Sequence, residues 1–379
     1  MEKPFAYGSY VFGDNFTDRV KETKRITANF NAGINTILIA PRRQGKTSLI
    51  NHVIEGIDNP EIKIVTMDIY DCRSEYDFYE RFTSEIIKST AGKIENISKT
   101  VSDFLGRVTP KISLSPDKMN DFSLSFGLSP KTITPQEAMN LPERIATKKN
   151  IHIIVCIDEF QQVGEFPNSL EVQKRIRGVW QLQKNVSYCL YGSKKHSMEK
   201  LFQNRKMPFY QFGDMIFMGK IPTDDWVAYI CSRFEKFGKS ISKDLAKEIC
   251  EKVENYSSYV QQYAWNVMVE AGEVVTEDDV KNGYETLMNQ VSSLFVEQIA
   301  GLTSYQMNFL RAISDGIHSG FGSAEILSEY DLGAKSNVTR LQKSLIEKEL
   351  IEKIGKEYYF IDPVFKVWIQ SVSQSPKFK

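Results

Sequence analysis

The chain has 379 residues, of which 41% are hydrophobic, and its 48 Lys and Arg balance 48 Asp and Glu. Splitting this length by common domain size predicts roughly two or three domains, and the composition is that of a folded globular protein rather than a disordered one. A net charge of zero excludes a general electrostatic attraction to nucleic acid or anionic membrane, so any such binding must be local.

No apolar run approaches the roughly 18 residues of a membrane-spanning helix, and the N-terminal stretch MEKPFAYGSYVFGDNF lacks the apolar core of a signal peptide. We therefore expect a cytoplasmic protein without a membrane partner. The cysteines are odd in number and widely spaced, and they are Cys72, Cys156, Cys189, Cys231 and Cys250. Because they form no C-x-x-C pair and no histidine clusters with them, we expect reduced, buried thiols and no protein-ligated metal.

The stretch IAPRRQGKTSLI, Ile39 to Ile50, predicts a phosphate-binding loop. It follows the β-rich run NTILIA and precedes a segment with helical spacing, which is the context that such a loop requires. Gly45, Lys46 and Thr47 supply the backbone N–H groups, the cation and the Mg²⁺-binding hydroxyl of the motif. Ala40 stands where G-x-x-x-x-G-K-[ST] opens with glycine, which is costly only if that position needs a positive φ. The expected nucleotide contacts are Pro41, Arg42, Arg43, Gln44, Gly45, Lys46, Thr47 and Ser48.

Four further apolar runs predict strands of a parallel sheet that is buried on both faces. They are EIKIVTMDIY from Glu61, IHIIVCIDEF from Ile151, VSYCLYGS from Val186 and DMIFMGKI from Asp214. The segments between these runs are long enough for crossover helices. The sequence therefore predicts an α/β fold with a P-loop ATPase core over residues 1–220.

Residues 111–129, KISLSPDKMNDFSLSFGLS, interrupt this order because apolar and polar residues alternate there. The period of two on each side of the turn at 116–121 predicts a β-hairpin insertion. The hairpin could contact a partner, although packing against the sheet edge is the simpler expectation.

In the run IHIIVCIDEF, the predicted strand ends in Asp158-Glu159, at the strand tip where α/β sheets bind ligands. Asp158 would hold Mg²⁺, usually through water, and Glu159 would orient and polarise the attacking water. Such a pair alone is usually a surface feature, but together with the phosphate loop it indicates hydrolysis, with Lys46 as a further catalytic residue. Ser193 could contact the γ-phosphate or the water, or cap the following helix. Candidates for an arginine finger are Arg175, Arg177 and Arg205, although for each of them a solvated helix or loop surface is the stronger expectation.

After Pro222 the sequence has helical spacing without strands, which predicts a helical lid over residues 221–300. Residues 301–379 then carry three helical segments and two short strands, the order of a winged helix. Its third helical segment offers candidate contacts to DNA at Lys335, Asn337, Arg340 and Lys343. The region holds ten Lys and Arg against nine Asp and Glu, short of the basic footprint of a DNA-binding domain, so protein contact or packing as part of the lid is the alternative.

With these motifs in order, the chain resembles the archaeal-type ATPases of the signal-transduction ATPase (STAND) clade, which are related to AAA+ proteins. The resemblance spans nearly the whole chain and rests on FTDR (16–19), PRRQGKTSL (41–49), CIDEFQQV (156–163), YGSKKHSM (191–198), YVQQYAW (259–265) and DPVFKVWI (362–369). It implies a P-loop core, a lid and a winged helix, with ATP or ADP and Mg²⁺ as cofactors. It also implies that Phe16 and Arg19 lie beside the adenine.

Two positions depart from the pattern of this family. Tyr256-Ser257-Ser258 stands where relatives often have Gly-x-Pro, and Gln211 stands where many carry a basic residue. If that basic residue senses the γ-phosphate, its loss could slow hydrolysis or weaken coupling.

The leading hypothesis is a Mg²⁺-dependent ATPase that acts as a nucleotide-controlled switch on its lid and winged helix, with DNA, a protein or a second copy of the chain as a possible partner. The alternative is a nucleotide-binding scaffold with little hydrolysis that mediates protein contacts. A small-molecule kinase has less support, since no acceptor-binding motif is evident.

Overall fold

The computed structural model describes residues 3–11, 13–91, 97–105, 111–114, 122–128 and 133–373. These residues form two compact units, each with its own hydrophobic core. The sheet unit comprises Arg19–Arg42 and Lys46–Gly219, and the helical unit comprises Met1–Asp18, Arg43–Gly45 and Lys220–Lys379. Among the described residues, no helix has both the length and the apolarity needed to cross a bilayer.

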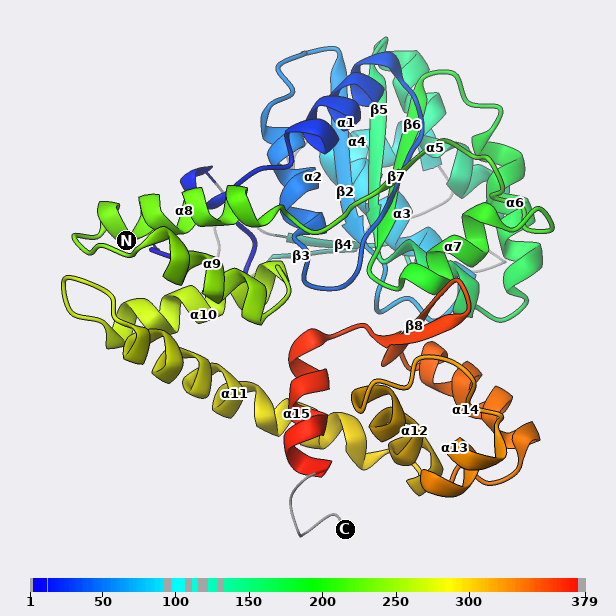
Figure 1. Cartoon of the computed structure of the whole chain (residues 1–379). Helices are drawn as coiled ribbons and strands as arrows, with labels where there is room; N and C mark the ends of the chain where they lie inside the picture. Colours follow the sequence, from blue (N-terminus) through cyan, green and yellow to red (C-terminus); the bar gives the residue numbers. More distant parts are fainter. Residues whose placement is uncertain are drawn as a thin grey trace. The chain divides into compact units, whose positions relative to one another are not determined.

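The sheet unit is built on a five-stranded parallel sheet with the strand order β2-β5-β6-β1-β7 (Figure 1). The strands are β1 (Thr36–Ile39), β2 (Ile62–Asp68), β5 (His152–Asp158), β6 (Val186–Gly192) and β7 (Asp214–Phe217). Each falls in an apolar run predicted as a strand. β1 and β6 are buried along their whole length, as expected for central strands of a sheet covered on both faces. The predicted α/β class is confirmed.

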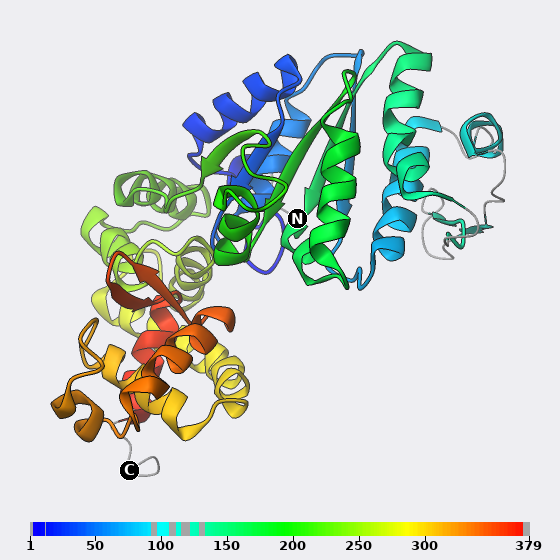
Figure 2. The ribbon, with the colours of Figure 1, turned by 90° about the vertical axis from the view of Figure 1, so that its right-hand side faces the viewer.

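Helices cover both faces of this sheet (Figure 2). They are α1 (Val20–Ala32), α2 (Lys46–Glu55), α3 (Glu75–Ala91), α5 (Pro135–Lys149), α6 (Ser169–Trp180) and α7 (Lys195–Gln203), whereas α4 (Ile97–Leu105) packs on α3 and α5. In Figure 2, α1 lies on one side of the sheet and α3 and α5 lie on the other. On the second side, Trp180 of α6 stacks on Tyr188 of β6 with 3.8 Å between ring centroids, and both rings are buried. Such aromatic pairs bury large apolar areas and fix α6 against the sheet.

A separate hairpin packs on α3. Its strands, β3 (Lys111–Leu114) and β4 (Phe122–Ser125), pair antiparallel, which confirms the predicted strands, whereas the predicted turn at 116–121 lies outside the described residues. Glu80 of α3 accepts hydrogen bonds from the backbone N–H groups of Phe126 and Leu128. The hairpin is a sheet of its own, and this carboxylate holds the backbone after β4 on α3. The expected packing against the sheet edge stays a prediction.

The helical unit contains the short 3-10 helix η1 (Gly13–Asn15) and then α8 (Thr223–Lys236), α9 (Lys243–Lys252), α10 (Ser257–Glu270) and α11 (Glu277–Ala300). The N-terminal segment packs in this unit: Phe5 is buried against Tyr229 and Phe234, and the guanidinium of Arg233 donates to the carbonyl of Pro4 at 2.7 Å. The first eighteen residues, which the sequence assigned to the core at 1–220, therefore group with the helical unit. The domain boundaries at 220 and 300 stay predictions.

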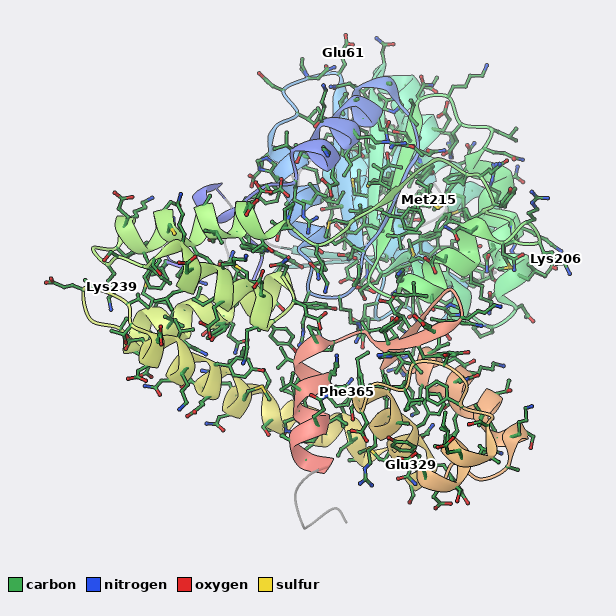
Figure 3. All side chains as sticks on the ribbon, in the orientation of Figure 1. Glu61, Lys206, Met215, Lys239, Glu329 and Phe365 are labelled. Atoms are coloured by element: carbon green, nitrogen blue, oxygen red, sulfur yellow. The ribbon has the colours of Figure 1, made fainter. Side chains whose placement is uncertain are left out.

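The predicted winged-helix order is present after α11. The elements are α12 (Ser304–Ser314), α13 (Ala324–Glu329), α14 (Lys335–Glu347), the antiparallel pair β8 (Ile351–Ile354) and β9 (Glu357–Phe360), and α15 (Pro363–Ser373). α15 was not predicted. Phe365 on this helix (Figure 3) packs its ring 5.2 Å from that of Phe295 on α11, and the indole of Trp368 donates to Ser292 at 2.8 Å. These contacts anchor the winged helix to α11.

Candidate nucleotide site

Strand register brings the sequence motifs of the sheet unit to one edge of the sheet. Ile39, the last residue of β1, pairs with Gly192 at the end of β6, and Leu190 of β6 pairs with Ile157 of β5. The residues that follow these strands therefore meet where the carboxyl ends of parallel strands converge. This edge is the ligand-binding edge of open α/β sheets.

The backbone of the phosphate loop answers the question raised by Ala40. Ala40 is fully buried and is not among the residues with positive φ, so its small side chain satisfies the position without the freedom of glycine. Left-handed backbone occurs instead at Arg43, with φ 62°, and at Gly45, with φ 82°. The loop keeps glycine where the turn needs it.

Lys46, Thr47 and Asp158 form a buried polar cluster. The Nζ of Lys46 contacts Oδ1 of Asp158, and the hydroxyl of Thr47 donates to Oδ2 of the same carboxylate at 2.8 Å. Lys46 and Asp158 are only 7% and 8% exposed, and Lys46 also lies over the ring of Tyr191 at 4.9 Å from its centroid. Burial of two charges is tolerated because each has the other as its partner.

Glu159 lies beside this cluster on left-handed backbone, with φ 55°. Its Oε2 accepts a hydrogen bond from the hydroxyl of Ser193 at 3.0 Å and another from the side-chain amide of Gln161, while its Oε1 is 3.8 Å from Nζ of Lys46. Ser193 does not cap α7, whose N-cap is Lys194 without a side-chain cap. The structure therefore brings together the three predicted catalytic residues, Lys46, Glu159 and Ser193.

The other residues predicted to contact the nucleotide differ in burial and in their hydrogen-bond partners. Arg42 is exposed and donates from Nε to Ser193 at 3.4 Å, Pro41 is half-buried and Ser48 is buried in α2. Arg19 is buried, and its guanidinium donates to the carbonyl of Gly219 at 2.7 Å and to Glu22 at 3.3 Å. Phe16 belongs to the helical unit, where its N–H donates to the carbonyl of Gly13.

Sequence reasoning missed Asp68, the last residue of β2. Asp68 pairs in register with Asp158 and accepts a hydrogen bond from the N–H of Tyr70 at 2.7 Å. Partial desolvation raises the pKa of Asp68, and the neighbouring carboxylates of Asp158 and Glu159 raise it further. An aspartate at the end of an apolar run was the available signal, the same one that identified Asp158.

In the helical unit, loop residues 43–45 form hydrogen bonds with α10, and α10 is in turn hydrogen-bonded to Asp362. Nη1 of Arg43 donates to the hydroxyl of Tyr259 at 2.9 Å, and that hydroxyl donates to Oδ2 of Asp362 at 2.6 Å. The N–H of Ser258 donates to the carbonyl of Arg43 at 3.2 Å, and the hydroxyl of Ser257 donates to Gln44 at 2.9 Å. Serines thus bond the loop at the place where relatives often carry Gly-x-Pro.

Asp362 joins this network to the winged helix. Its Oδ1 accepts from the N–H groups of Val364 and Phe365 at 2.9 and 3.0 Å, in the first turn of α15. A carboxylate in that place is favoured by the free N–H groups and the helix dipole. Burial raises the pKa of Asp362, and the hydrogen bond from Tyr259 opposes that rise.

The candidate arginine fingers and DNA contacts differ in exposure and in the hydrogen bonds that they make. Arg175 pairs with Glu75, Arg177 donates to Gln181 at 2.7 Å, and Arg205 is exposed. On α14, Lys335, Arg340 and Lys343 are exposed. Both ends of the Asn337 amide are engaged, because Nδ2 donates to the carbonyl of Leu332 at 2.9 Å and Oδ1 accepts from Arg340 at 2.7 Å.

A parallel sheet of this strand order with a phosphate loop after β1 is the fold of P-loop ATPases. In this chain a winged helix follows at the C-terminal end. Among solved structures, a Walker-type ATPase of Pyrococcus abyssi is similar with a TM-score of 0.69 and 16% identity, over 97% of this chain and 100% of that one. The ORC2 protein of Aeropyrum pernix is similar with a TM-score of 0.54 and 13% identity, over 95% of this chain and 96% of that one. These similarities establish a shared fold, and they confirm the resemblance drawn from the motifs at that level.

The C-terminal region has an independent match. Residues 293–371 match the family model of a probable winged helix domain. No curated protein matches the sequence of this chain.

Proposed function

We propose that this chain is a Mg²⁺-dependent ATPase of the archaeal type that acts as a nucleotide-controlled switch. The observation that carries the proposal is the contact of Lys46 and Thr47, at the start of α2, with Asp158 at the end of β5. A phosphate-loop lysine and hydroxyl meet an acidic strand tip when the two motifs serve one ligand. The structure of Aeropyrum pernix ORC2, which has a similar fold, contains ADPNP and ADP, and this supports a nucleotide as that ligand.

The residues at the sheet edge fit Mg²⁺ with ATP or ADP. The Thr47 hydroxyl and the Asp158 carboxylate offer the oxygen ligands that Mg²⁺ prefers, with Asp158 acting through water. In the described part of the chain, no three His, Cys, Asp or Glu side chains are grouped to bind a metal. The proposal is that the ion is held through nucleotide phosphates and water. Residues 41–48 contact those phosphates, and Phe16 and Arg19 contact the base by resemblance to the family.

The side chains around the cluster have distinct roles in hydrolysis. Lys46 exchanges Asp158 for phosphate oxygens when ATP binds, and bound Mg²⁺ supplies further neutralisation of phosphate charge. Glu159 orients and polarises the attacking water. Ser193 holds Glu159 by the hydrogen bond to Oε2 and is available to the γ-phosphate or the water.

The switch rests on the contacts of Arg43. This residue lies in the middle of the phosphate loop and bonds Tyr259 of α10, which bonds Asp362 at the start of α15. A change in the loop on nucleotide binding would alter these hydrogen bonds. A switch requires a set of contacts that can adopt two alternative arrangements. The nucleotide state thereby biases the position of the lid and winged helix.

The decisive experiment compares the wild type with Lys46→Ala and with Lys174→Ala, an exposed lysine on α6. We expect Mg²⁺-dependent ATP binding by calorimetry and ATP hydrolysis by phosphate release in the wild type and in Lys174→Ala. Lys46→Ala should lose both, because the phosphate charge then has no lysine partner. A wild type that neither binds ATP nor shows hydrolysis sensitive to Lys46→Ala would sink the proposal.

Specific observations favour two further candidates. Gln211 stands where many members of the resembled family carry a basic residue, which favours a nucleotide-binding scaffold with little hydrolysis, or a site completed by an arginine from a protein partner or a second copy. The exposed Lys335, Arg340 and Lys343 on α14 favour DNA as a partner. The cytoplasmic location stays a prediction from sequence.

A further inference from the structure

Glu159 lies outside regular secondary structure, and neighbouring side chains hold its carboxylate. Glu159 follows the last residue of β5 and is the N-cap of the 3-10 helix Phe160–Glu165, on left-handed backbone. Its own N–H donates to Oδ1 of Asp158 at 2.8 Å. A non-glycine residue in that conformation persists only where the surroundings fix it, and such positions gather at functional sites.

Gln161 is one of the groups that fix it. Its side chain is 2% exposed, and its amide faces Oε2 of Glu159. A carboxylate can only accept hydrogen bonds, so the atom that faces it must be the donor Nε2. Ser193 donates to the same oxygen, which leaves Oε1 of Glu159, 3.8 Å from Nζ of Lys46, as the oxygen free of these two donors.

The other end of the Gln161 amide has no evident structural purpose. Oε1 of Gln161 is buried and has no hydrogen-bond partner among the described residues. Leaving a buried carbonyl unpaired destabilises a fold, so this glutamine is not explained by stability.

Gly192 explains how the side chain fits. A Cβ on Gly192 would lie 1.9 Å from Oε1 of Gln161 and 3.1 Å from Sδ of Met198. Gly192 is not among the glycines with positive φ, so its backbone does not require glycine. Its missing side chain therefore provides space, and Gln161 occupies that space.

We propose that Gln161 is a positioning residue that holds Glu159 with its Oε1 turned toward the reacting water, and that Gly192 is glycine in order to admit it. The inference rests on the proposed function, because it takes Glu159 as the residue that polarises water. It also links two motifs, because Gln161 comes from the segment after β5 and Gly192 ends β6.

The first test replaces the amide. In Gln161→Met, which keeps the length of the side chain and removes the donor, we expect kcat for ATP hydrolysis to fall about 10- to 100-fold with KM changed less than about twofold, since general-base positioning contributes on that scale. The matched control is Gln173→Met: Gln173 on α6 is also fully buried with an unpaired Oε1, but it bonds Ser169 instead of a carboxylate. The control should keep the wild-type kcat.

A pH profile separates positioning from packing. In Gln161→Glu the introduced group repels Glu159 when ionised and donates to it when protonated, so activity relative to the wild type should rise as the pH is lowered from 8 to 6. A ratio that does not depend on pH would overturn the inference, because a residue that only fills space has no such dependence.

A double-mutant cycle tests the role of Gly192. Gly192→Ala alone should lower kcat about tenfold, because the new methyl group displaces Gln161. In the Gln161→Ala background the same change should cost less than about twofold, since the clash with Gln161 is gone and only the 3.1 Å approach to the flexible Met198 side chain remains. Additive effects would overturn the pairing of these two residues.

The outcomes also separate this inference from the proposed function. Wild-type hydrolysis that is lost in Glu159→Gln but unchanged in Gln161→Met contradicts the role of Gln161 alone. A wild type without hydrolysis contradicts both. Thermal unfolding of each variant, which should stay cooperative, checks that a loss of kcat is not a loss of fold.

Discussion

Two polar regions that the sequence singled out differ in how they are built. At the sheet edge, Lys46 and Asp158 are almost fully buried and pair with each other, and Glu159 lies 3.8 Å from Lys46. On α14 the cationic side chains face solvent, and Lys343, 79% exposed, has only a 3.8 Å contact with Glu347 one turn along the same helix. Burying a charge is expensive unless it is paired, whereas an exposed ion pair contributes little.

This difference decides how much each motif says about function. A buried, mutually bonded set of charges is retained at a cost that only a structural or chemical role offsets. An exposed set of cations on one helix can arise on any solvated surface, and the engaged amide of Asn337 leaves even fewer groups to read a base. The nucleotide proposal therefore rests on firmer physical ground than the DNA proposal.

The largest expected effect comes from the buried region. Glu159→Gln keeps the size of the side chain but removes the negative charge that we propose polarises water. We expect kcat for ATP hydrolysis to fall at least about 100-fold while ATP binding is kept, so that ATP stays on the protein instead of being released as ADP. Chromatography of the bound nucleotide measures this. Glu165→Gln, at the exposed end of the same 3-10 helix, is the control and should behave as the wild type.

The next effect concerns the link between the loop and the winged helix. Tyr259→Phe removes the hydroxyl that bonds both Arg43 and the half-buried Asp362. We expect unfolding to become easier by about 1–3 kcal/mol, because hydrogen bonds to charged groups are lost. We also expect protection of the C-terminal region from proteolysis to lose its dependence on ATP or ADP.

The control for this link is Tyr263→Phe, one turn further along α10. The hydroxyl of Tyr263 is buried and donates to the carbonyl of Val280 at 3.0 Å, away from the phosphate loop. This variant should lose stability but keep the nucleotide dependence. If both variants keep it, Tyr259 does not carry the switch.

The features that could be predicted are those with a local signal. Each strand of the parallel sheet is a short apolar run, and Lys46, Thr47, Asp158 and Glu159 follow such runs at fixed offsets. The three helices and the hairpin of the winged helix were readable for the same reason, since period and turn residues lie within each segment.

The features that could not be predicted depend on tertiary contacts. Tyr259 and Asp362 are 103 positions apart, and no spacing rule joins them. Gln161 and Gly192 lie in two separate motifs, and no spacing rule joins them. Only the register of β5 and β6 places Gly192 where its missing side chain leaves space for Gln161. The hairpin at 111–129 was recognised by its alternation, but its support, Glu80, lies on a helix that the alternation does not involve.

A smaller effect is expected on α14. If this helix contacts DNA phosphates, Arg340→Ala with Lys343→Ala should weaken duplex binding about tenfold at low salt and reduce the salt dependence by about two released ions. Electrophoretic shifts across a salt series measure both quantities. Lys247→Ala, an exposed lysine on α9, should change neither. No shift of wild-type protein at low salt would rule out the DNA candidate.

The smallest effect tests the acidic edge of the sheet. Because partial desolvation and the carboxylates of Asp158 and Glu159 raise the pKa of Asp68, the folded protein holds that proton more tightly than the unfolded chain. The free energy of unfolding therefore falls as the pH rises through the interval between the ordinary and the raised pKa, and the cost is fully present above the raised pKa.

Asp68→Asn should remove this cost and still accept the hydrogen bond from Tyr70. Since the side chain keeps solvent access, we expect a gain of less than about 0.5 kcal/mol at pH 7, shrinking as the pH approaches about 4. Urea unfolding at several pH values measures it, with the exposed Asp71→Asn as control. A gain that persists at low pH would assign the effect to packing. A gain that follows the titration would instead place the charge of Asp68 in the same electrostatic field as Asp158 and Glu159, and so extend the charged cluster to the exposed end of β2.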